Sequence, residues 1–560
     1  MKSLWALLSN TTVAPLVPRL KKELLAMQVE HEVFISQYGE AVQQLLQPDS
    51  KLYAAKPDML VLYLDLGQLR PDLNDALAFS ASSQRADIQA EIVSEVLALV
   101  RSARAHCDAT ILVNNFPVLP RTALGIGLDP VFKFAVRQMN QRLAEELSGM
   151  PNCVLYDCDS LWAEVGWSDR DRRFEMLAQF PFGQKLQRLL VREWLRYFRA
   201  LQGRARKCVV VDLDNTLWGG ILGEDGPENI QMGDTPHGRP YRCFQQNLQT
   251  LSRRGILLAV CSKNNSADVL AVFRDHPDLL LREKDFASLQ INWQDKATNL
   301  RAIASELNIG LQHLVFIDDN PTERQWVREA LPEVLVPELP TDAALYADVL
   351  TDCELDTLAL TEEDLRRTRM YSEDRKRREF KVAAPTYEQF LHELGLEVQV
   401  DALTPQMLDR AAQLCQRTNQ FNLTTRRHTA VDLQSFASSP GAVVLMMSVR
   451  DRFGDYGCTG LSIGLRNGAR LEIDSFMVSC RVLGKQVEYA LFAALVDWAR
   501  RTDCTDVVGS YVPTAKNSIC AEFYPKCGLL PAGSNPQTFV RALAELTAAP
   551  IDHIKLSVNF

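Results

Sequence analysis

Two aspartates separated by one residue follow a short apolar run at residues 207–211. The run is rich in valine, which is typical of a buried strand, so Asp212 and Asp214 stand at a strand end where Asn215 and Thr216 open a turn. On extended backbone, side chains two residues apart point to the same side. Two such carboxylates repel each other unless a cation lies between them, and oxygen ligands suit Mg²⁺. The stretch therefore predicts a magnesium site, whereas alone it would equally fit a surface turn.

Later segments supply the other groups that such a site needs. A second apolar run ends at Ser262, where a hydroxyl and nearby backbone amides could hold a phosphate oxygen. Lys296 begins an amphipathic helical pattern, and a third apolar run ends in Asp318 and Asp319. In an open parallel sheet, the carboxyl ends of the strands border one crevice. We therefore expect these groups to converge although they are far apart in the sequence.

This ordered set resembles the haloacid dehalogenase superfamily of phosphatases. The motifs are DLDNT, Ser262, Lys296 and IDDN, in that order along the chain. The resemblance implies that Asp212 is the nucleophile that takes the phosphoryl group. It implies that Asp214 protonates the leaving oxygen and later activates water.

The same resemblance implies a metal site and a phosphate site. Asp318 would hold Mg²⁺ together with Asp212 and the backbone carbonyl of Asp214, with Asp319 as an outer or alternate ligand. The residues implied to bind the phosphate and balance the charge of the transferring phosphoryl group are Ser262, Lys263 and Lys296.

Composition limits the class of protein. A chain of 560 residues is long enough for three or four domains, and 47% apolar with 23% charged residues is typical of a soluble globular protein. A net charge of −9 argues against a nucleic-acid partner. Thirteen cysteines without CxxC spacing indicate reduced thiols, and no apolar stretch approaches membrane-spanning length. We expect a cytoplasmic protein with no membrane partner.

The first two hundred residues alternate apolar runs with helical patterns, which predicts a parallel-sheet α/β domain. The layout looks like an SGNH-hydrolase fold, but SNTT replaces the serine block and no histidine lies near CDSLWAEVG. Without a base for a hydroxyl nucleophile, we expect a docking or structural role. The polar residues at the strand ends would then serve in loops and helix caps; they are Ser9, Asn10, Asn114 and Asp157.

Two connecting segments carry less chemistry. The part of residues 219–255 that precedes the next helix is rich in glycine and proline, which predicts a short flap in place of a full cap domain, with His237 exposed and not catalytic. Residues 351–383 mix charges of both signs and predict a solvated helical connector, although its basic residues could guide an acidic carrier protein.

The third region resembles the GNAT acyltransferase fold in its order of helix, three strands, helix and strand. SCRVLGKQ occupies the place of the turn that binds a pyrophosphate in that family. Gln486 replaces a family glycine there, which argues against free coenzyme A and leaves binding of a phosphopantetheine arm. The residues implied to bind such an acyl arm are Arg481, Gly484, Asn517 and Tyr524.

Together the three regions resemble the FkbH-like glyceryltransferase/phosphatases, with TNQFNLTTRR and SCRVLG as further shared stretches. The resemblance implies transfer of a glyceryl unit from 1,3-bisphosphoglycerate to an acyl carrier protein for polyketide-type biosynthesis. It implies three α/β domains around a central Rossmann-like fold. The expected divisions are 1–203 (SGNH-like, non-catalytic), 204–350 (phosphatase, minimal cap), 351–383 (connector) and 384–560 (GNAT-like, mixed sheet).

An acyl phosphate is readily attacked by a thiolate, so a cysteine could carry the acyl group. Cys480 is the first choice because we expect it at a strand end beside Arg481 and a helix N-terminus, which both lower a thiol pKa. Cys261 is the rival, and a buried inert cysteine is the alternative for either. Two further hypotheses stay open: a plain Mg²⁺ phosphatase whose outer domains bind a partner or substrate, and a binding protein with an inactive site.

Overall fold

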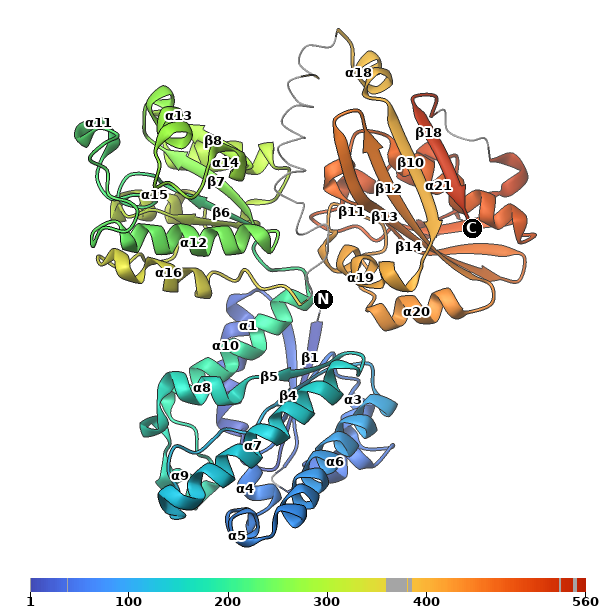
Figure 1. Cartoon of the computed structure of the whole chain (residues 1–560). Coiled ribbons are helices and arrows are strands. Elements are labelled where there is room, and N and C mark those ends of the chain that lie inside the picture. The colour runs from blue at the N-terminus through green and yellow to red at the C-terminus, as the bar shows by residue number, and fades with distance from the viewer. Residues whose placement is uncertain (1, 38, 359–379, 381–384, 533–534, 547–550) are drawn as a thin grey trace. The chain divides into compact units, whose positions relative to one another are not determined.

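The computed structural model describes residues 2–37, 39–358, 380, 385–532, 535–546 and 551–560. The chain forms two compact units, Met1–Phe198 and Arg199–Phe560. The first contains one β-sheet and the second contains two, each with helices packed against it (Figure 1). The predicted α/β class, with parallel sheets and a mixed sheet, is confirmed. Most of the connector expected at 351–383 lies outside the described residues, and among the described helices none is both long and apolar enough to cross a bilayer.

Five parallel strands form the sheet of the first unit, in the order β2-β1-β3-β4-β5. Four of them coincide with predicted apolar runs: β1 (Lys2–Ser9), β3 (Met59–Tyr63), β4 (Thr110–Asn114) and β5 (Cys153–Tyr156). The apolar pattern misses β2 (Glu30–Ile35), because an edge strand is only half buried and this one carries glutamates and a histidine.

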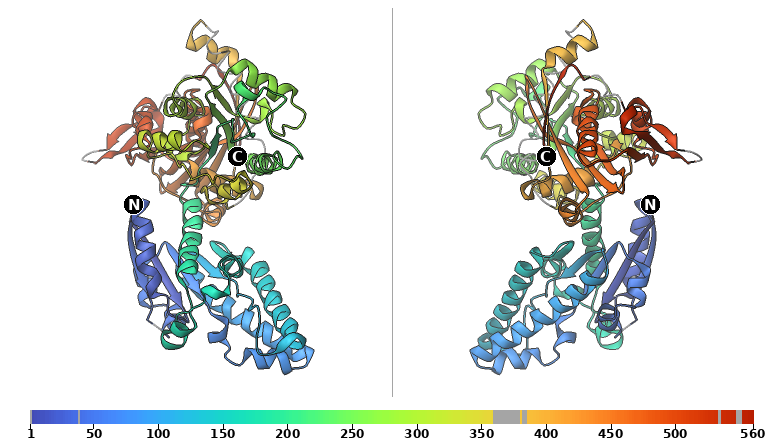
Figure 2. Two further views of the ribbon diagram at one scale, coloured as in Figure 1. Left: turned by 90° about the vertical axis from the view of Figure 1, so that its left-hand side faces the viewer. Right: turned by 90° about the vertical axis from the view of Figure 1, so that its right-hand side faces the viewer.

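Helices cover both faces of this sheet (Figures 1 and 2). Helices α6 (Ser82–His106) and α7 (Gly125–Ser148) share an apolar core with the strands on one face. On the other face lie α1 (Val17–Ala26) and α10 (Gln184–Leu201), where the ring of Phe198 packs 5.3 Å from that of Trp5 in β1. Burial of both faces explains why β1, β3 and β4 read as continuous apolar runs.

The second unit begins with a four-stranded parallel sheet in the order β8-β7-β6-β9. Helices α12 (Arg239–Arg253) and α13 (Ser266–Asp275) share an apolar core with one face. The opposite face packs against α14 (Lys296–Glu306) and α15 (Pro321–Ala330). The strands are β6 (Cys208–Val211), β7 (Leu257–Ser262), β8 (Ser288–Ile291) and β9 (Leu314–Ile317).

The segment between β6 and α12 is a short flap and not a separate cap domain. It contains the single turn α11 (Leu222–Asp225), and the backbones of Gly219 and Gln231 exchange two hydrogen bonds of 3.0 and 2.7 Å. Asn215 and Gly220 have φ of +53° and +94°, and the Asn215 side chain accepts a 2.9 Å bond from the Gly220 amide. These turns fold the flap back on itself directly after the DLDNT motif.

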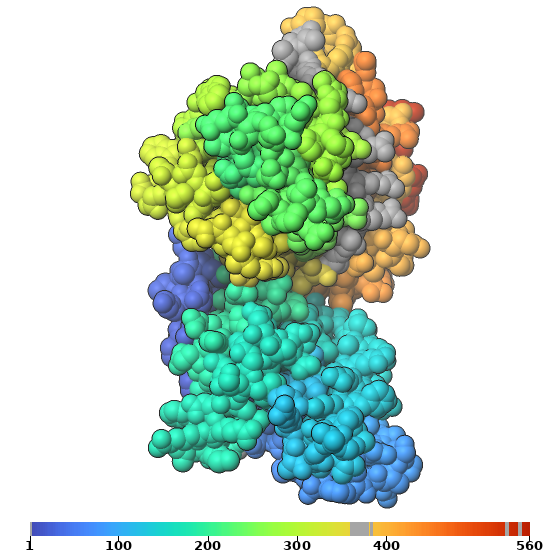
Figure 3. Space-filling model, turned by 60° about the vertical axis from the view of Figure 1, so that its left-hand side comes forward, coloured from blue at the N-terminus to red at the C-terminus, as the bar shows by residue number. Residues whose placement is uncertain are grey.

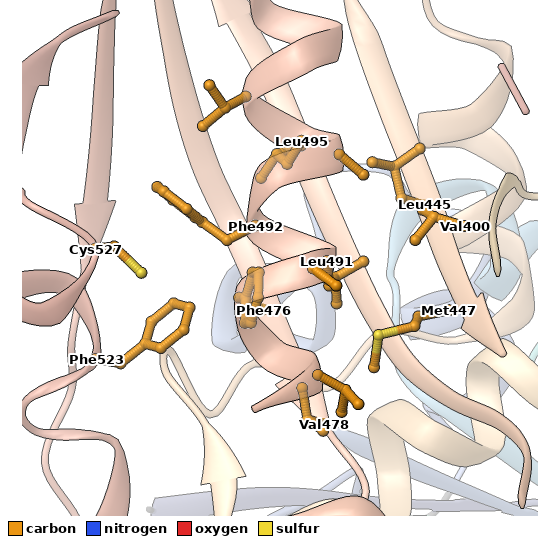
Figure 4. Packing of buried hydrophobic residues seen from close by; sticks show 14 of the residues in the cluster. Val400, Leu445, Met447, Phe476, Val478, Leu491, Phe492, Leu495, Phe523 and Cys527 are labelled. Atoms are coloured by element: carbon orange, nitrogen blue, oxygen red, sulfur yellow. The ribbon is translucent and has the colours of Figure 1, made fainter. Parts of the chain in front are cut away.

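A mixed sheet of nine strands forms the rest of the second unit. Strands β14 (Arg470–Val478) and β15 (Asp506–Ser510) run parallel and are joined by α21 (Val487–Arg501). Leu491, Phe492 and Leu495 of α21 pack among buried residues of the sheet (Figure 4). The remaining strands are β10 (Leu396–Ala402), β11 (Phe421–Asn422), β12 (Ala442–Asp451), β13 (Gly454–Asn467), β16 (Leu530–Ala532), β17 (Asn535–Ala542) and β18 (Ile554–Asn559).

The amphipathic pattern of residues 404–422 predicts a helix over this whole stretch, but the observed helix is shorter. The observed helix is α19 (Leu408–Arg417), and Phe421 and Asn422 form β11, which pairs with β14. The ring of Phe421 packs 5.3 Å from that of Phe523. This tertiary contact draws the chain away from the helix although the apolar spacing would have allowed it to continue.

Candidate functional site

The register of the four-stranded sheet brings the predicted groups to one edge. Val211 in β6 pairs with both Val260 in β7 and Ile317 in β9. The next residues, Asp212 and Asp318, therefore leave neighbouring strands side by side, and the Asp212 amide donates a 2.9 Å hydrogen bond to the Ile317 carbonyl. The segments that carry this edge are green to yellow in Figure 3.

Lys296 is the buried cation of the site. It is the first residue of α14, is 2% exposed, and places its ammonium nitrogen 2.8 Å from a carboxylate oxygen of Asp212 and 3.2 Å from one of Asp318. The ammonium group also donates a 2.7 Å bond to the Cys261 carbonyl. Burial opposes the charge of Lys296, but the two carboxylates outweigh burial and raise its pKa well above the usual value.

Three carboxylates form a group that could hold a metal ion. One oxygen from each of Asp212, Asp318 and Asp319 lies within 4.8 Å of the others. Thr216 orients Asp319, because its hydroxyl accepts a 3.1 Å bond from the Asp319 amide and donates a 3.4 Å bond to the carboxylate. Burial and the charge of Asp212 raise the pKa of both Asp318 and Asp319. A hard divalent cation fits this set, because all its donors are oxygens whose mutual repulsion the cation would offset.

Asp214 faces three hydrogen-bond donors. The Trp218 indole N–H lies 3.0 Å and the Leu222 amide 3.1 Å from one carboxylate oxygen, and the Asn264 amide lies 2.9 Å from the other. The Asn264 side chain also donates a 3.3 Å bond to the hydroxyl of buried Ser262. Asp214 and Ser262 are therefore linked through one side chain. The motif spacing did not reveal Trp218 or Asn264, although both lie within four residues of a predicted site residue.

Helix α15 contacts the backbone of the residues that follow β9. One guanidinium nitrogen of Arg324 donates to the backbone carbonyls of Asp318 and Asp319 at 2.8 and 2.7 Å. Glu323 binds the ammonium group of Lys263 at 2.5 Å. The charge of Lys263, predicted to contact phosphate, is thus partly offset by a carboxylate of α15.

Cys261 is buried in the core between the sheet and α14. Burial raises the pKa of its thiol to about 12. The thiolate required of an acyl carrier is therefore strongly disfavoured at this position.

Cys480 lies elsewhere in the second unit. It opens a single 3₁₀ turn, Cys480–Val482, and its carbonyl accepts a 2.8 Å bond from the Asn308 side chain. The expectation that an α-helix N-terminus adjoins Cys480 is wrong, because α21 begins only at Val487. The sequence between them forms the 3₁₀ turn and a turn at Gly484, where φ is +80°.

A cavity that Cys480 lines also touches Lys207, Leu257 and His313. These three residues lie at the amino ends of β6, β7 and β9, whereas Asp212 follows the carboxyl end of β6. At about 3.3 Å per residue, Lys207 and Asp212 are roughly 17 Å apart. Cys480 and the aspartate group therefore lie at opposite edges of one sheet.

Two of the four residues expected to bind an acyl arm, Asn517 and Tyr524, are buried. Asn517 is fully buried: its side-chain oxygen accepts a 2.7 Å bond from the Thr514 amide, and its nitrogen donates to the carbonyls of Asn422 and Val512 at 2.9 Å. Tyr524 is 1% exposed, and burial raises its pKa. The hydrogen bonds of Asn517 hold the loop that follows β15 against β11.

The other two arm residues lie nearer the surface. Arg481 lines the cavity with Cys480, and its guanidinium group donates a 3.3 Å bond to the Ser479 hydroxyl. Gly484 accepts a hydrogen bond at its carbonyl from the Tyr387 hydroxyl.

Polar residues at the strand ends of the first unit are engaged in local hydrogen bonds. The Asn10 side chain exchanges bonds of 2.9 and 2.7 Å with the Asp65 backbone, and Asn114 does the same with Leu64 at 2.9 and 2.7 Å. The Ser9 hydroxyl accepts a 3.0 Å bond from Thr11, and Asp157 caps α8 (Cys158–Val165). These contacts hold the loops at the sheet edge.

Comparison with known proteins adds two findings. The family model described as FkbH, N-terminal domain, matches residues 5–183. The crystal structure of the N-terminal part of BF1531 from Bacteroides fragilis, containing a phosphatase domain complexed with Mg, is 30% identical with a TM-score of 0.58. That similarity covers 64% of this chain and 95% of the other.

The C-terminal region has more distant structural neighbours. A spermidine N-acetyltransferase variant from Vibrio cholerae is 12% identical over 26% of this chain and 95% of its own, with a TM-score of 0.21. Ard1 from Thermoplasma volcanium is 16% identical over 26% of this chain and 97% of its own, also with a TM-score of 0.21. None of the curated proteins matches the sequence.

Proposed function

The chain belongs to the FkbH family, and from this premise we propose that it is an Mg²⁺-dependent phosphatase that also loads a glyceryl unit onto an acyl carrier protein. The acyl donor is 1,3-bisphosphoglycerate, and the product feeds polyketide-type biosynthesis. The proposal assigns phosphate removal to residues 204–350 and acyl transfer to residues 384–560. Residues 1–203 have a non-catalytic role in it.

One observation supports the phosphatase activity in this proposal. At the carboxyl edge of the parallel sheet, the carboxylates of Asp212, Asp318 and Asp319 lie close together, and Lys296 forms ion pairs with the first two. The three aspartates would hold Mg²⁺, together with the backbone carbonyl of Asp214. When bound, the ion would offset the negative charge of the phosphate and of the aspartates. Lys296 supplies a further positive charge that is already held in place.

The geometry supports a two-step displacement. A carboxylate oxygen of Asp212 attacks phosphorus, and the bond between phosphorus and the leaving oxygen breaks as Asp214 gives that oxygen a proton. Asp214 then takes a proton from water, whose oxygen attacks phosphorus and releases inorganic phosphate and Asp212. The three donors around Asp214 hold it in one orientation for both proton transfers.

The proposed acyl-transfer activity depends on Cys480. Its thiolate attacks the carbonyl carbon of the acyl phosphate, a carbon–sulfur bond forms, and phosphate leaves with the electrons of the broken carbon–oxygen bond. The thiol of the carrier's phosphopantetheine arm then takes the acyl group by thioester exchange. Partial exposure of Cys480 supports this assignment over buried Cys261.

The separation of Cys480 from Asp212 favours a second candidate function. In this alternative the protein is a plain Mg²⁺ phosphatase, and its outer regions only bind a partner or the substrate. A single bound substrate could not touch both residues across the sheet.

Intact-mass spectrometry after incubation with 1,3-bisphosphoglycerate and a carrier protein separates the two functions. We expect a glyceryl adduct on the enzyme and then on the carrier, and we expect Cys480→Ala to abolish both. Phosphate release with no adduct on either protein would leave only the phosphatase.

The Asp212→Asn variant tests the nucleophile. We expect release of phosphate from the 3-position to fall at least about a thousandfold, since no neutral amide can take the phosphoryl group. Asp225→Asn is the matched control, because Asp225 lies in the flap and not in the aspartate group. Undiminished release in Asp212→Asn would remove Asp212 from its role.

A further inference from the structure

Helix α9 (Arg172–Ala178), labelled in Figure 1, belongs to the first unit and exposes its apolar side chains. The exposed fractions of Phe174, Met176 and Leu177 are 55%, 81% and 73%, and none of the seven residues of this fully described helix is buried. A surface helix ordinarily turns its apolar residues toward the core. The apolar residues of α9 therefore contribute little to the core of the first unit and are available to a partner.

Polar contacts fix the position of α9. Asp171 caps its start by accepting a 3.0 Å hydrogen bond from a backbone amide of the first turn. Directly after the helix, the carbonyl of Gln179 accepts a 2.9 Å bond from the Thr12 amide. Glu175, the acidic residue of the helix, accepts a 2.8 Å bond from the guanidinium group of Arg170. These contacts hold in place a helix whose apolar side is not packed against the unit.

Five side chains succeed one another around the exposed side of α9. At about 100° per residue they cover roughly 200° of the helix, in the order Arg172, Met176, Arg173, Leu177 and Phe174. Both arginines are exposed, and among the residues that the structure describes neither forms an ion pair. This α9 face therefore combines three apolar side chains with two positive charges that no carboxylate offsets.

We propose that the α9 face docks the acyl carrier protein. The inference rests on the proposed acyl transfer, which requires a carrier, and it gives the non-catalytic first unit the task of holding that carrier. Two unpaired arginines select an acidic partner, and an acidic carrier protein has this charge. Leu177 and Phe174, three residues apart on one side of the helix, have the spacing with which a helix inserts apolar anchors into a partner's groove.

The charge of the face also argues against a second copy of this chain as the partner. A two-fold contact through the α9 face would bring the arginines of both copies to one interface. Like charges at an interface oppose association, whereas acidic side chains of a carrier would attract the same arginines.

Isothermal titration calorimetry tests the face without requiring turnover. The holo acyl carrier protein of fatty-acid synthesis is titrated into the full-length protein, Leu177→Ser and Arg173→Gln, at low and at high sodium chloride. Ile126→Ser and Lys21→Gln are the matched controls, because each removes an exposed residue of the same kind elsewhere in the first unit. Hydrolysis of p-nitrophenyl phosphate by every variant reports separately on the phosphatase activity.

We expect Leu177→Ser to weaken carrier binding at least about tenfold, because an apolar anchor loses its buried contact. Arg173→Gln should weaken it at least about threefold at low salt and less at high salt, where the charge is screened. The controls should bind as the original protein does. Absence of binding, or equal affinity in all variants, would overturn the docking face, while intact hydrolysis of p-nitrophenyl phosphate would leave the phosphatase standing. Binding with no glyceryl adduct on the carrier would sustain the face and overturn the acyl transfer.

The same variants test two other occupants of the α9 face. A dimer that Leu177→Ser converts to a monomer in light scattering would assign the face to a second copy. Sedimentation of the protein with anionic phospholipid vesicles, lost in Arg173→Gln, would assign it to a membrane surface. Either result in place of carrier binding would overturn the assignment to the carrier.

Discussion

Three hydrogen-bond donors hold the Asp214 carboxylate in one orientation, which distinguishes it from an aspartate on an exposed surface turn. Its carboxylate accepts hydrogen bonds from Trp218, Leu222 and Asn264, and Asn264 connects it to Ser262. A hydrogen bond to a carboxylate contributes about 1.5–3 kcal/mol. Loss of one donor should therefore change the chemical step measurably.

For Trp218→Phe we expect kcat for a phosphate monoester such as p-nitrophenyl phosphate to fall between about tenfold and a hundredfold, with KM nearly unchanged. The phenyl ring keeps most of the buried packing and removes only the indole N–H. Trp5→Phe, in the core of the first unit, is the control and should leave kcat as it is. A change in KM alone would show that Trp218 supports binding and not proton transfer.

Among the elements, α14 has the most direct effect on the site, because its first residue is Lys296. Asp295 caps this helix by accepting a 3.0 Å hydrogen bond from the Thr298 amide. The bond to Thr298 also lowers the pKa of Asp295, so the cap is ionised at neutral pH. The first turn of α14 thus holds the ammonium group where both carboxylates can reach it.

We expect Asp295→Ala to weaken this turn by about 1 kcal/mol, whereas Asp295→Asn keeps a side-chain acceptor and should cost little. Hydrogen–deuterium exchange of peptides from α14 measures the difference. Exchange at the helix start should quicken about fivefold in the alanine variant and stay near the original rate in the asparagine variant. Equal exchange in all three proteins would show that the cap does not hold the helix.

At the scale of the whole molecule, the clustered carboxylates couple metal binding to stability. Asp212, Asp318 and Asp319 repel one another in the folded state, and a cation that binds only this state stabilises it. The first unit contributes no residue to this group, so its unfolding should not respond.

We expect differential scanning calorimetry to show a Mg²⁺-dependent rise in the melting transition of the second unit. At a thousand times the dissociation constant the gain is about 4 kcal/mol, or several degrees. EDTA should reverse the rise. Asp318→Asn should abolish most of it, while Asp225→Asn keeps it. A transition that ignores Mg²⁺ in the original protein would contradict the metal site.

The local pattern of apolar residues was sufficient to predict the central strands of the parallel sheets, but not every strand. Strands β1, β3, β4, β6, β7 and β9 are continuous apolar runs, because both faces of their sheets are covered by helices. Edge strands β2 and β8 contain fewer apolar residues, so the search for apolar runs did not predict them. The end of α19 was decided by the contact of Phe421 with Phe523, which no local spacing encodes.

The order of strands and motifs along the chain was enough to predict which residues meet at the carboxyl edge of the four-stranded sheet. Parallel strands end at one edge, so a residue's place after its strand already says where it lies. Three other features could be seen only in the folded chain: Cys480 lies near the opposite edge of this sheet, Asn517 and Tyr524 are buried, and side chains from separate elements line one cavity with Cys480. Those facts depend on how two sheets pack, and packing joins residues whose separation along the chain carries no information about their distance.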